Sequence, residues 1–365
     1  MIRKQGFLLI TTCILSGYSK PAYIPATDSS TITATKSKID FTGYQLVLQD
    51  DFNGGTLNTK TWDYFDENKI RGFGKMQRSD VKVSNGTLKL YATKTTTTLH
   101  DISFSSGMVS TQHSLNQRYG YFEIRAKLNS QVGPHAAFWL LQHSVGIVNK
   151  VPNPSLFGTE IDVFEYHCGA GTEYLYYGLH WNGYNFSDGS HRVITGQSYI
   201  PGIDKGFHKF ALEWTPKEYI VYVDDIERAR SSEAVSHIPE FVLLSMEISG
   251  NGGDRFKMSD ATPDVFEVDY IKIYARKPAV TIYEKPDYYG WVSQPLLPGS
   301  YTTAQLAALG VINNQASSIE VPKGWKVIAY ADDNFRGDSI VVTTDARSGG
   351  AFDNKLSSVK VTDHL

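Results

Sequence analysis

The sequence contains little cysteine, with Cys13 and Cys168 as the two copies in 365 residues. Cys13 lies in an N-terminal segment that we expect to be removed, so no intrachain disulfide is expected in the mature protein. An excess of charge of one sign is also missing, because 35 Lys and Arg stand against 38 Asp and Glu, a net charge of −3. That balance argues against a nucleic-acid partner. Stability must therefore come from packing, to which a bound metal can add.

The sequence also lacks an apolar run that could form a permanent transmembrane helix. The apolar run at residues 6–17 is too short, and with Arg3 and Lys4 before it, it is typical of a signal peptide over residues 1–18. We therefore expect export, to the medium, the bacterial cell surface or the periplasm. Residues 15–18 resemble a lipoprotein cleavage box, but Tyr18 replaces the lipidated cysteine and Cys13 follows a weaker box, so a lipid anchor stays open. Residues 19–40, rich in Ser, Thr and Pro, predict a flexible tether.

Helical periodicity is nearly absent, and short alternating strands separated by turn residues follow from residue 41 to about 275. So many strands predict an all-β, two-sheet sandwich or jelly roll, whose concave sheet would make a cleft. Aromatic residues are 13% of the chain, which fits both sugar-stacking platforms and an ordinary β-rich core. Strands are predicted at residues 44–48, 81–83, 87–92, 107–110, 119–128, 136–141, 161–166, 174–181, 207–214, 219–223, 241–248 and 266–274.

One of these strands carries three carboxylates, Glu160, Asp162 and Glu165. Alternation places the first two on one face and would send Glu165 into the apolar layer. A β-bulge near Val163 and Phe164 would add one residue and return Glu165 to the face of the other two. We therefore predict a bulge that brings all three acids to one surface.

Like charges this close raise one another's pKa, so three acids on one strand are a poor structural choice. A retaining glycosidase uses such an arrangement, because it needs one ionised carboxylate as nucleophile and one protonated acid about 5 to 5.5 Å away. The alternative is a solvated edge strand with scattered acids. The bulge-length spacing and the apolar insert favour the catalytic interpretation.

Eight landmarks in chain order resemble glycoside hydrolase family 16, over roughly residues 41 to 276. They are the segments at 50–54, Trp62, 106–111, 119–127, 137–141, 160–165, 207–216 and 268–274. The resemblance implies a concanavalin-like β-jelly roll and a retaining endo-hydrolase of β-linked polysaccharides. It assigns Glu160 as nucleophile, Glu165 as general acid/base and Asp162 as the group that orients and tunes Glu160. The extra residue in the strand resembles the laminarinase, agarase and carrageenase branch.

The sequence departs from the family pattern around the expected cleft. His135 and Ala136 replace a Trp-Pro pair, so that His135 displaces an aromatic platform. The loop at 71–78 carries Arg71, Lys75 and Arg78, which would hold an anionic or sulfated glycan or would simply form a solvated basic loop.

Further candidates for sugar binding follow from the positions of aromatic and imidazole side chains. We expect Trp139 to line the cleft. For His180 and for Trp181, a position in the cleft and one in the core are both open. Cys168 is expected to be a small buried filler. The family resemblance also implies a structural calcium ion on the convex side of the jelly roll, at Asp51 and Asp269.

The last part of the chain, residues 279–363, contains an internal repeat. Tyr283 is followed by Gly290 and Tyr330 by Gly337, and each copy ends in a run rich in Asn and Ser, at 313–318 and 353–358. This resembles a βγ-crystallin domain, a double Greek key with paired calcium clamps. Oxygen ligands suit Ca²⁺, and a turn without metal is the alternative. The expected ligands are Asn313, Asn314, Ser317, Asp353, Asn354 and Ser357.

These features predict an exported, monomeric retaining endo-β-glycosidase with no catalytic cofactor and with structural Ca²⁺. The expected substrate is a β-1,3- or mixed-linkage glucan, and a galactan such as agar, porphyran, carrageenan or β-1,3-galactan is the alternative. A non-catalytic carbohydrate-binding protein on the same fold would be expected to lose one of the acids, and this chain keeps all three. The sequence does not separate hydrolysis from transglycosylation, or show whether the C-terminal domain binds glycan or only stabilises the enzyme.

Overall fold

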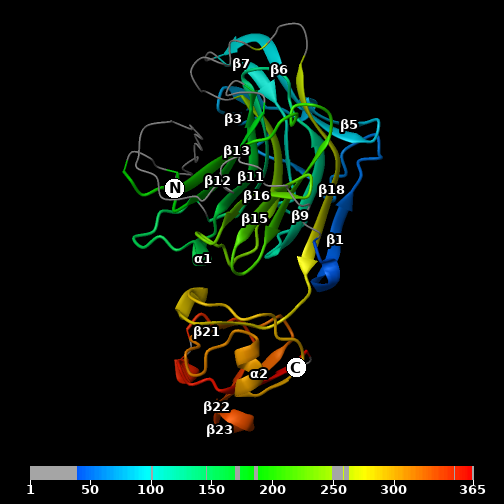
Figure 1. Ribbon diagram of the computed structural model, residues 1–365. Helices are drawn as coiled ribbons and strands as arrows, with labels where there is room; N and C mark the ends of the chain where they lie inside the picture. Colours follow the sequence, from blue (N-terminus) through cyan, green and yellow to red (C-terminus); the bar gives the residue numbers. More distant parts are fainter. Residues whose placement is uncertain are drawn as a thin grey trace. The chain divides into compact units, whose positions relative to one another are not determined.

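The computed structural model describes residues 39–99, 102–144, 146–168, 173–184, 188–248, 258, 263–348 and 350–363. The predicted signal peptide and almost all of the predicted tether lie outside these residues. The contacts divide the chain into two compact units, Met1–Ala275 and Arg276–Leu365 (Figure 1). In the described ranges, no helix is both long and apolar enough to cross a membrane.

The first unit is all-β and contains two stacked sheets (Figure 1). The larger has the order β16-β15-β14-β9-β18-β6-β7-β4-β3, with β1 paired to β18 and β5 to β6. Its strands are β1 (Tyr44–Asp50), β3 (Ile70–Arg71), β4 (Gly74–Met76), β5 (Val81–Ser84), β6 (Thr87–Leu99), β7 (Ile102–Ser106), β9 (Gly120–Lys127), β14 (His208–Trp214), β15 (Tyr219–Val223), β16 (Ile226–Ser231) and β18 (Asp264–Arg276).

The smaller sheet has the order β13-β12-β11-β10-β17-β8-β2 and carries the three carboxylates on β11. Its strands are β2 (Asp63–Tyr64), β8 (Met108–Ser110), β10 (Pro134–Leu141), β11 (Glu160–His167), β12 (Tyr174–Trp181), β13 (Arg192–Tyr199) and β17 (Phe241–Ile248). The one helix described in this unit besides short 3-10 turns, α1 (Pro154–Phe157), has four residues. Every strand predicted from alternation is present, and the all-β sandwich is confirmed.

The core lies between the two sheets and is held by aromatic side chains from both. Phe164 of β11 contacts Phe210 of β14, with ring centroids 4.4 Å apart, and Phe266 of β18 at 6.0 Å. All three rings are completely or almost completely buried. Burying such a side chain contributes about 1.5–3 kcal/mol. The opposite face of the smaller sheet is thereby left to carry polar groups.

The second unit has a two-stranded sheet, β19 (Thr281–Tyr283) with β21 (Ser318–Glu320), and a four-stranded sheet. The latter has the order β20-β24-β22-β23, made of β20 (Gly299–Tyr301), β22 (Lys326–Asp332), β23 (Arg336–Val342) and β24 (Ser358–Thr362). Helix α2 (Thr303–Ala308) begins with a capping box between Thr302 and Gln305. The unit has an apolar core of its own.

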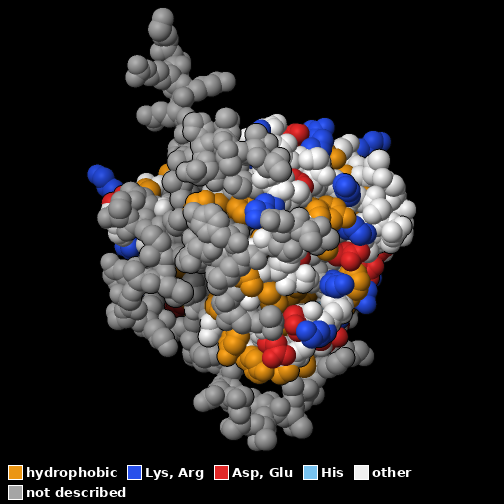
Figure 2. All heavy atoms as spheres, turned by 90° about the horizontal axis from the view of Figure 1, so that it is seen from above, with side chains coloured by type: hydrophobic (Ala, Val, Ile, Leu, Met, Phe, Trp, Pro, Cys, Tyr) orange, Lys and Arg blue, Asp and Glu red, His pale blue; other side chains and the backbone are white. Residues whose placement is uncertain are grey.

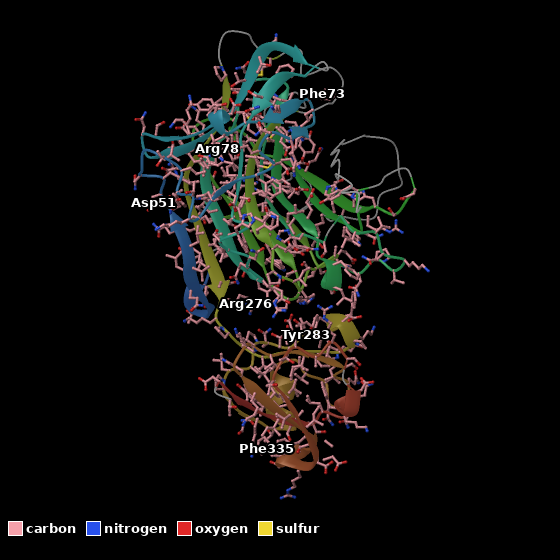
Figure 3. All side chains as sticks on the ribbon, turned by 180° about the vertical axis from the view of Figure 1, so that it is seen from behind. Asp51, Phe73, Arg78, Arg276, Tyr283 and Phe335 are labelled. Carbon is pink, nitrogen blue, oxygen red and sulfur yellow. The ribbon has the colours of Figure 1, made fainter. Side chains whose placement is uncertain are left out.

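The internal repeat of the second unit appears as two matching local structures, marked by Tyr283 and Phe335 in Figure 3. In the first copy the Tyr288 N–H donates to Ser318 Oγ at 3.1 Å, and in the second the Phe335 N–H donates to Ser358 Oγ at 3.0 Å. Each hydroxyl in turn donates to a backbone carbonyl of its own copy. The sequence repeat is therefore also a structural repeat.

Candidate active site

The carboxylate strand β11 contains the predicted bulge. Glu160 lies opposite His180 and Glu165 opposite Tyr176, so that three steps on β11 from Asp162 to Glu165 match two steps on β12. Val163 and Phe164, the residues at the bulge, are completely buried in the core between the sheets. Glu160, Asp162 and Glu165 consequently share the opposite face, where the first two are 7% and 6% exposed.

Glu160 lies beside one hydrogen-bond donor, a second acid and two positively charged groups. Tyr184, in the loop after β12, donates its hydroxyl to Glu160 Oε2. Burial raises the pKa of Glu160 to about 7, helped by Asp162, while His180, the Tyr184 hydrogen bond and the Arg71 guanidinium oppose the rise. Tyr184 was not among the residues predicted from the sequence, because no periodicity places a loop side chain against a strand.

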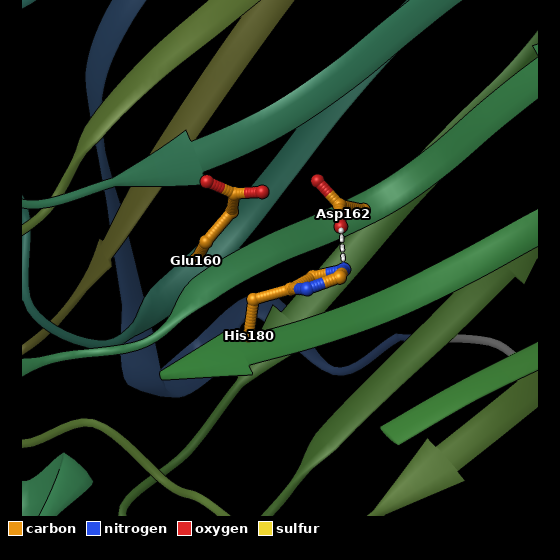
Figure 4. Close-up of side chains that lie close together, drawn as sticks. All are labelled: Glu160, Asp162 and His180. Atoms are coloured by element: carbon orange, nitrogen blue, oxygen red, sulfur yellow. Dashed lines mark ion pairs between the residues drawn. The ribbon is translucent and has the colours of Figure 1, made fainter. Parts of the chain in front are cut away.

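Asp162 is paired with His180, the neighbouring side chain on β12 (Figure 4). His180 Nε2 lies 3.4 Å from Asp162 Oδ2, and His180 Nδ1 lies 3.1 Å from His191 Nε2. Burial lowers the pKa of His180, but the hydrogen bond and charge of Asp162 outweigh it and raise that pKa to about 9. Gly178 leaves room for this pair, since a Cβ there would lie 2.3 Å from Asp162 Oδ2.

The three side chains of Figure 4 also have a spacing that a metal ion could use, because ligand atoms of Glu160, Asp162 and His180 lie within 4.8 Å of one another. A metal needs the neutral imidazole, however. With a pKa of about 9, His180 carries a proton at neutral pH and supplies the positive charge itself.

Glu165 is the most exposed of the three acids, with 17% of its side chain open to solvent. Burial raises the pKa of Glu165 to about 7, with His180 opposing and Glu160 and Glu247 adding to the rise. His135 and His167 flank it, each with Nε2 at 3.9 Å from Glu165 Oε1. His135 thus lies at the site, as predicted, and His167 is an addition that the sequence analysis did not include.

The sequence left Arg71 open between a site for an anionic glycan and a solvated basic loop, and its position in the structure fits neither. Its side chain is buried and its Nε and one terminal nitrogen lie 3.1 and 3.4 Å from the two carboxylate oxygens of Glu247. The other terminal nitrogen lies 3.2 Å from Asp66. Two acids therefore neutralise the cation.

Arg78 is also paired, with Glu67 at 2.8 Å, and lies over the ring of Tyr64, although more than half of its side chain is exposed (Figure 3). Its role in sugar binding stays a prediction. On the described part of the face in Figure 2, basic and acidic side chains are interspersed. Of the three cations in the loop, Arg71 and Arg78 therefore both have acidic partners.

The two predicted tryptophans lie on opposite faces of the smaller sheet. Trp139 pairs in register with Asp162 and so shares the face of the carboxylates, but it is 4% exposed, with Arg71 over its ring at 5.5 Å. Trp181 packs against the core between the sheets, which is the core alternative of the two that the sequence left open. Its neighbour His180 points to the site because successive residues of a strand alternate in direction.

The carboxylates predicted to bind calcium in the jelly roll have other partners. Asp269 lies 2.5 Å from an Arg125 nitrogen, and Asp51 accepts from the side chain of Gln49 at 2.8 Å. Neither acid belongs to a cluster of three metal-ligating side chains in the described ranges. Calcium at Asp51 and Asp269 therefore stays a prediction.

Three of the predicted calcium ligands of the second unit, Asn314, Asn354 and Ser357, lie where the two Asn/Ser runs contact each other. Ser357 Oγ donates to Asn314 Oδ1 at 3.1 Å. Asn314 N–H donates to the Leu356 carbonyl at 3.1 Å, and Asn354 N–H to the Ala316 carbonyl at 2.9 Å. The two Asn/Ser runs therefore cross, and they bring side-chain and backbone oxygens close together.

Parts of the chain are similar in sequence to known proteins. The chain is 31% identical over 173 residues to the endo-1,3-1,4-beta-glycanase EglC of Rhizobium meliloti. The match covers 47% of this chain and 34%, about a third, of EglC. Over 82 residues, 22% of the chain, it is 45% identical to the development-specific protein S of Myxococcus xanthus and covers 47% of that protein.

Among solved structures, the laminarinase from Flavobacterium sp. UMI-01 superposes with a TM-score of 0.51 at 28% identity. The match covers 63% of this chain and all of the laminarinase. A family model described as glycosyl hydrolases family 16 matches residues 73–272, more than half of the chain. The chain therefore belongs to glycosyl hydrolases family 16.

Proposed function

We propose that the chain is a retaining endo-β-glucanase that cleaves a β-1,3- or mixed-linkage glucan. The observation that carries the proposal is the bulge at Val163 and Phe164, which brings Glu160, Asp162 and Glu165 to one face. Retaining glycosidases need two carboxylates with opposite protonation states on either side of the scissile bond. The bulge supplies this pair with a third acid between them.

The surroundings of the acids support different roles for Glu160 and Glu165. Glu160 has three groups that favour its ionised form, namely His180, Tyr184 and Arg71. Burial raises the pKa of both acids to about 7, but the rise at Glu165 is opposed by His180 without a hydrogen bond from a tyrosine or a nearby guanidinium. Glu160 is therefore the nucleophile that attacks the anomeric carbon, and Glu165 is the acid that protonates the departing oxygen. Asp162, held by His180, orients the nucleophile.

The charge of the site favours a neutral glycan over an anionic galactan. Four acids, Glu160, Asp162, Glu165 and Glu247, lie near two cations, Arg71 and His180. Arg71 is already paired with Glu247 and Asp66. A sulfate or carboxylate on the sugar would meet uncompensated negative charge. EglC is named an endo-1,3-1,4-beta-glycanase and the solved structure a laminarinase, and these names support a β-1,3- or mixed-linkage substrate.

The test is to incubate the protein with neutral and sulfated polysaccharides, size the products and follow the anomeric configuration of new reducing ends by NMR. We expect products of several sizes from a β-1,3- or mixed-linkage glucan, with retained β configuration. Glu160→Ala should abolish turnover, and Glu165→Ala should be rescued on an activated aryl glycoside. Inverted products, or full activity of Glu160→Ala, would contradict the mechanism.

We also propose that the second unit, over residues 279–363, is a calcium-binding βγ-crystallin-like domain. The crossing of the two Asn/Ser runs provides the oxygen donors that Ca²⁺ prefers. The 45% identity over 82 residues to protein S supports a separate domain, because a stretch of that length fits the part of the chain after the family 16 match. The ligands would come from Asn313, Asn314, Ser317, Asp353, Asn354 and Ser357.

Export remains part of the proposal, with residues 1–18 as the signal peptide and 19–40 as the tether. A polysaccharide too large to enter a cell requires an enzyme outside it. N-terminal sequencing of the mature protein, with mass spectrometry to detect a lipid, would test the cleavage site. An uncleaved N-terminus would contradict it.

A further inference from the structure

Two histidines form a stacked pair beside the proposed catalytic acid. His135 of β10 and His167 of β11 are partners in the strand register, with ring centroids 4.6 Å apart and planes inclined by 25°. Both Nε2 atoms lie 3.9 Å from Glu165 Oε1. Their side chains are 13% and 18% exposed, so a ligand can reach them. The pair and the acid thus converge on one point.

Both rings are neutral at neutral pH. Burial lowers the pKa of His135 well below its usual range and that of His167 to about 4, with Glu247 opposing only part of the latter shift. His135 Nδ1 is buried and has no hydrogen-bond partner in the described ranges. A buried lone pair without a partner costs less than a buried N–H without one, so the proton of His135 lies on Nε2, facing Glu165.

The charged groups around the histidine pair form ion pairs with other residues. On β17, Glu247 is held by Arg71 of β3, and on β12, His180 is held by Asp162. Tyr176 of β12 presents its ring edge-on to His167, with centroids 5.7 Å apart. The site therefore offers neutral donors and acceptors, which suit an uncharged ligand.

A separation of 3.9 Å is too long for a direct hydrogen bond and leaves room for one bridging oxygen. Along β11, His167 follows Glu165 while Glu160 precedes it, so the histidines lie on the side of the acid away from the nucleophile. The anomeric carbon must lie between Glu160 and Glu165. The oxygen bound by the histidines therefore lies on the other side of Glu165 from that carbon.

We propose that His135, His167 and Glu165 form a site for one hydroxyl group of the sugar on the leaving-group side of the scissile bond. The inference rests on the proposed function and extends it. In glycosylation, Glu165 gives its proton to the glycosidic oxygen, the C1–O bond breaks and the C1–Oε bond to Glu160 forms. The histidines hold the departing sugar and neither gain nor lose a proton.

In the second half of the reaction, the same site binds a sugar that accepts the glycosyl group. An acceptor hydroxyl attacks C1, its proton passes to Glu165 and the bond from C1 to Glu160 breaks. Water in place of the acceptor gives hydrolysis. The histidine pair therefore sets how often the glycosyl-enzyme is transferred to sugar instead of water.

The test compares two substrates with the same glycone in His135→Phe, His167→Phe and the double variant. A laminari-oligosaccharide has a sugar leaving group, whereas the matched nitrophenyl β-glycoside does not. Phenylalanine keeps the stacked ring and removes the nitrogen atoms. His167→Gln restores a polar group. His113→Phe, at an exposed histidine, controls for the general effect of replacing a histidine with phenylalanine.

We expect kcat/KM on the oligosaccharide to fall about tenfold per variant, the size of one lost hydrogen bond. Turnover of the aryl glycoside should stay within about twofold, and transfer to an added sugar acceptor should fall relative to hydrolysis. Partial recovery by His167→Gln would support a hydrogen-bonding role. An equal loss on both substrates, or no loss on either, would overturn the inference. Aryl-glycoside turnover by Glu160→Ala would instead contradict the proposed nucleophile, whatever the histidine variants do.

Discussion

Phe164 of β11 lies against Phe210 of β14, with ring centroids 4.4 Å apart, and this contact joins the bulge to the opposite sheet. The bulge places Phe164 completely in the core, whereas Asp162 and Glu165 on either side of it face away from the core. Core packing on one side of β11 therefore fixes the positions of the acids on the other side.

We predict that Phe164→Ala lowers the free energy of unfolding by about 3–5 kcal/mol, the usual cost of removing a buried aromatic ring. It should also lower kcat/KM of the folded fraction, because the bulge loses its contact with Phe210. Phe122→Ala, at an equally buried ring on β9, is the matched control. It should destabilise the protein similarly while the folded fraction keeps its kcat/KM. Denaturant unfolding and kinetics at a temperature where both variants are folded would check this.

The bulge and the main strands could be predicted because both show in the alternating pattern of the sequence. Three acids that break an alternating pattern predict an extra residue, and β11 contains it. The strands β13 and β16 were missed because polar and charged residues dominate both. Local alternation has no signal for such strands at or near the edge of a sheet.

The surroundings of the acids were harder to predict, since they depend on contacts between distant residues. Arg71 looks like a free cation in the sequence, but Glu247, which neutralises it, is 176 residues away. Whether His180 or Trp181 faces the site depends on the register between β11 and β12, which neither strand encodes alone. Tyr184 reaches Glu160 from a loop, where no periodicity applies.

We predict that His180→Gln moves the acid limb of the pH dependence of kcat/KM to higher pH. Protonated His180 favours the ionised forms of Glu160 and Asp162, so its removal raises both pKa values. The nucleophile then ionises only at higher pH. The alkaline limb should move in the same direction, because His180 also lowers the pKa of Glu165. An unchanged profile, equal to that of the surface variant His113→Gln, would contradict the role of His180.

We predict that Tyr184→Phe lowers kcat/KM by roughly 10- to 100-fold, since a hydrogen bond to a charged group contributes about 1.5–3 kcal/mol. The hydroxyl that donates to Glu160 would be lost while the ring stays in place. Tyr199→Phe is a matched control, because Tyr199 also donates to a glutamate, Glu173, but is 54% exposed. Equal activities of the two variants would show that the contact with Glu160 has no catalytic role.

We predict that calcium raises the unfolding temperature of the second unit and that EDTA reverses the effect, because the ion binds the folded form. Ser317→Ala and Ser357→Ala each remove one buried hydroxyl from the crossing Asn/Ser runs and should weaken binding. Ser293→Ala, at a buried serine outside those runs whose hydroxyl accepts from the Ile282 N–H, is the control. Calorimetric titration with Ca²⁺ would measure the affinities. The absence of binding to the unaltered protein would contradict the calcium proposal.

Glu240 should make the stability of the first unit fall as the pH rises. Its side chain is 1% exposed, Oε1 accepts from the Thr159 N–H, and Oε2 has no hydrogen-bond partner in the described ranges. Burial raises the pKa of Glu240 from 4.5 to about 8, so between these values the folded state holds a proton that the unfolded state has lost. Stability from this group is therefore complete below pH 4.5 and decreases up to about pH 8, by at most about 1.4 kcal/mol per pH unit.

Glu240→Gln cannot lose a proton, so its free energy of unfolding should exceed that of the unaltered protein by an amount that grows from pH 5 to pH 8. Denaturant unfolding of both proteins across this range would measure the difference, and a constant difference would show that Glu240 is already ionised in the folded state.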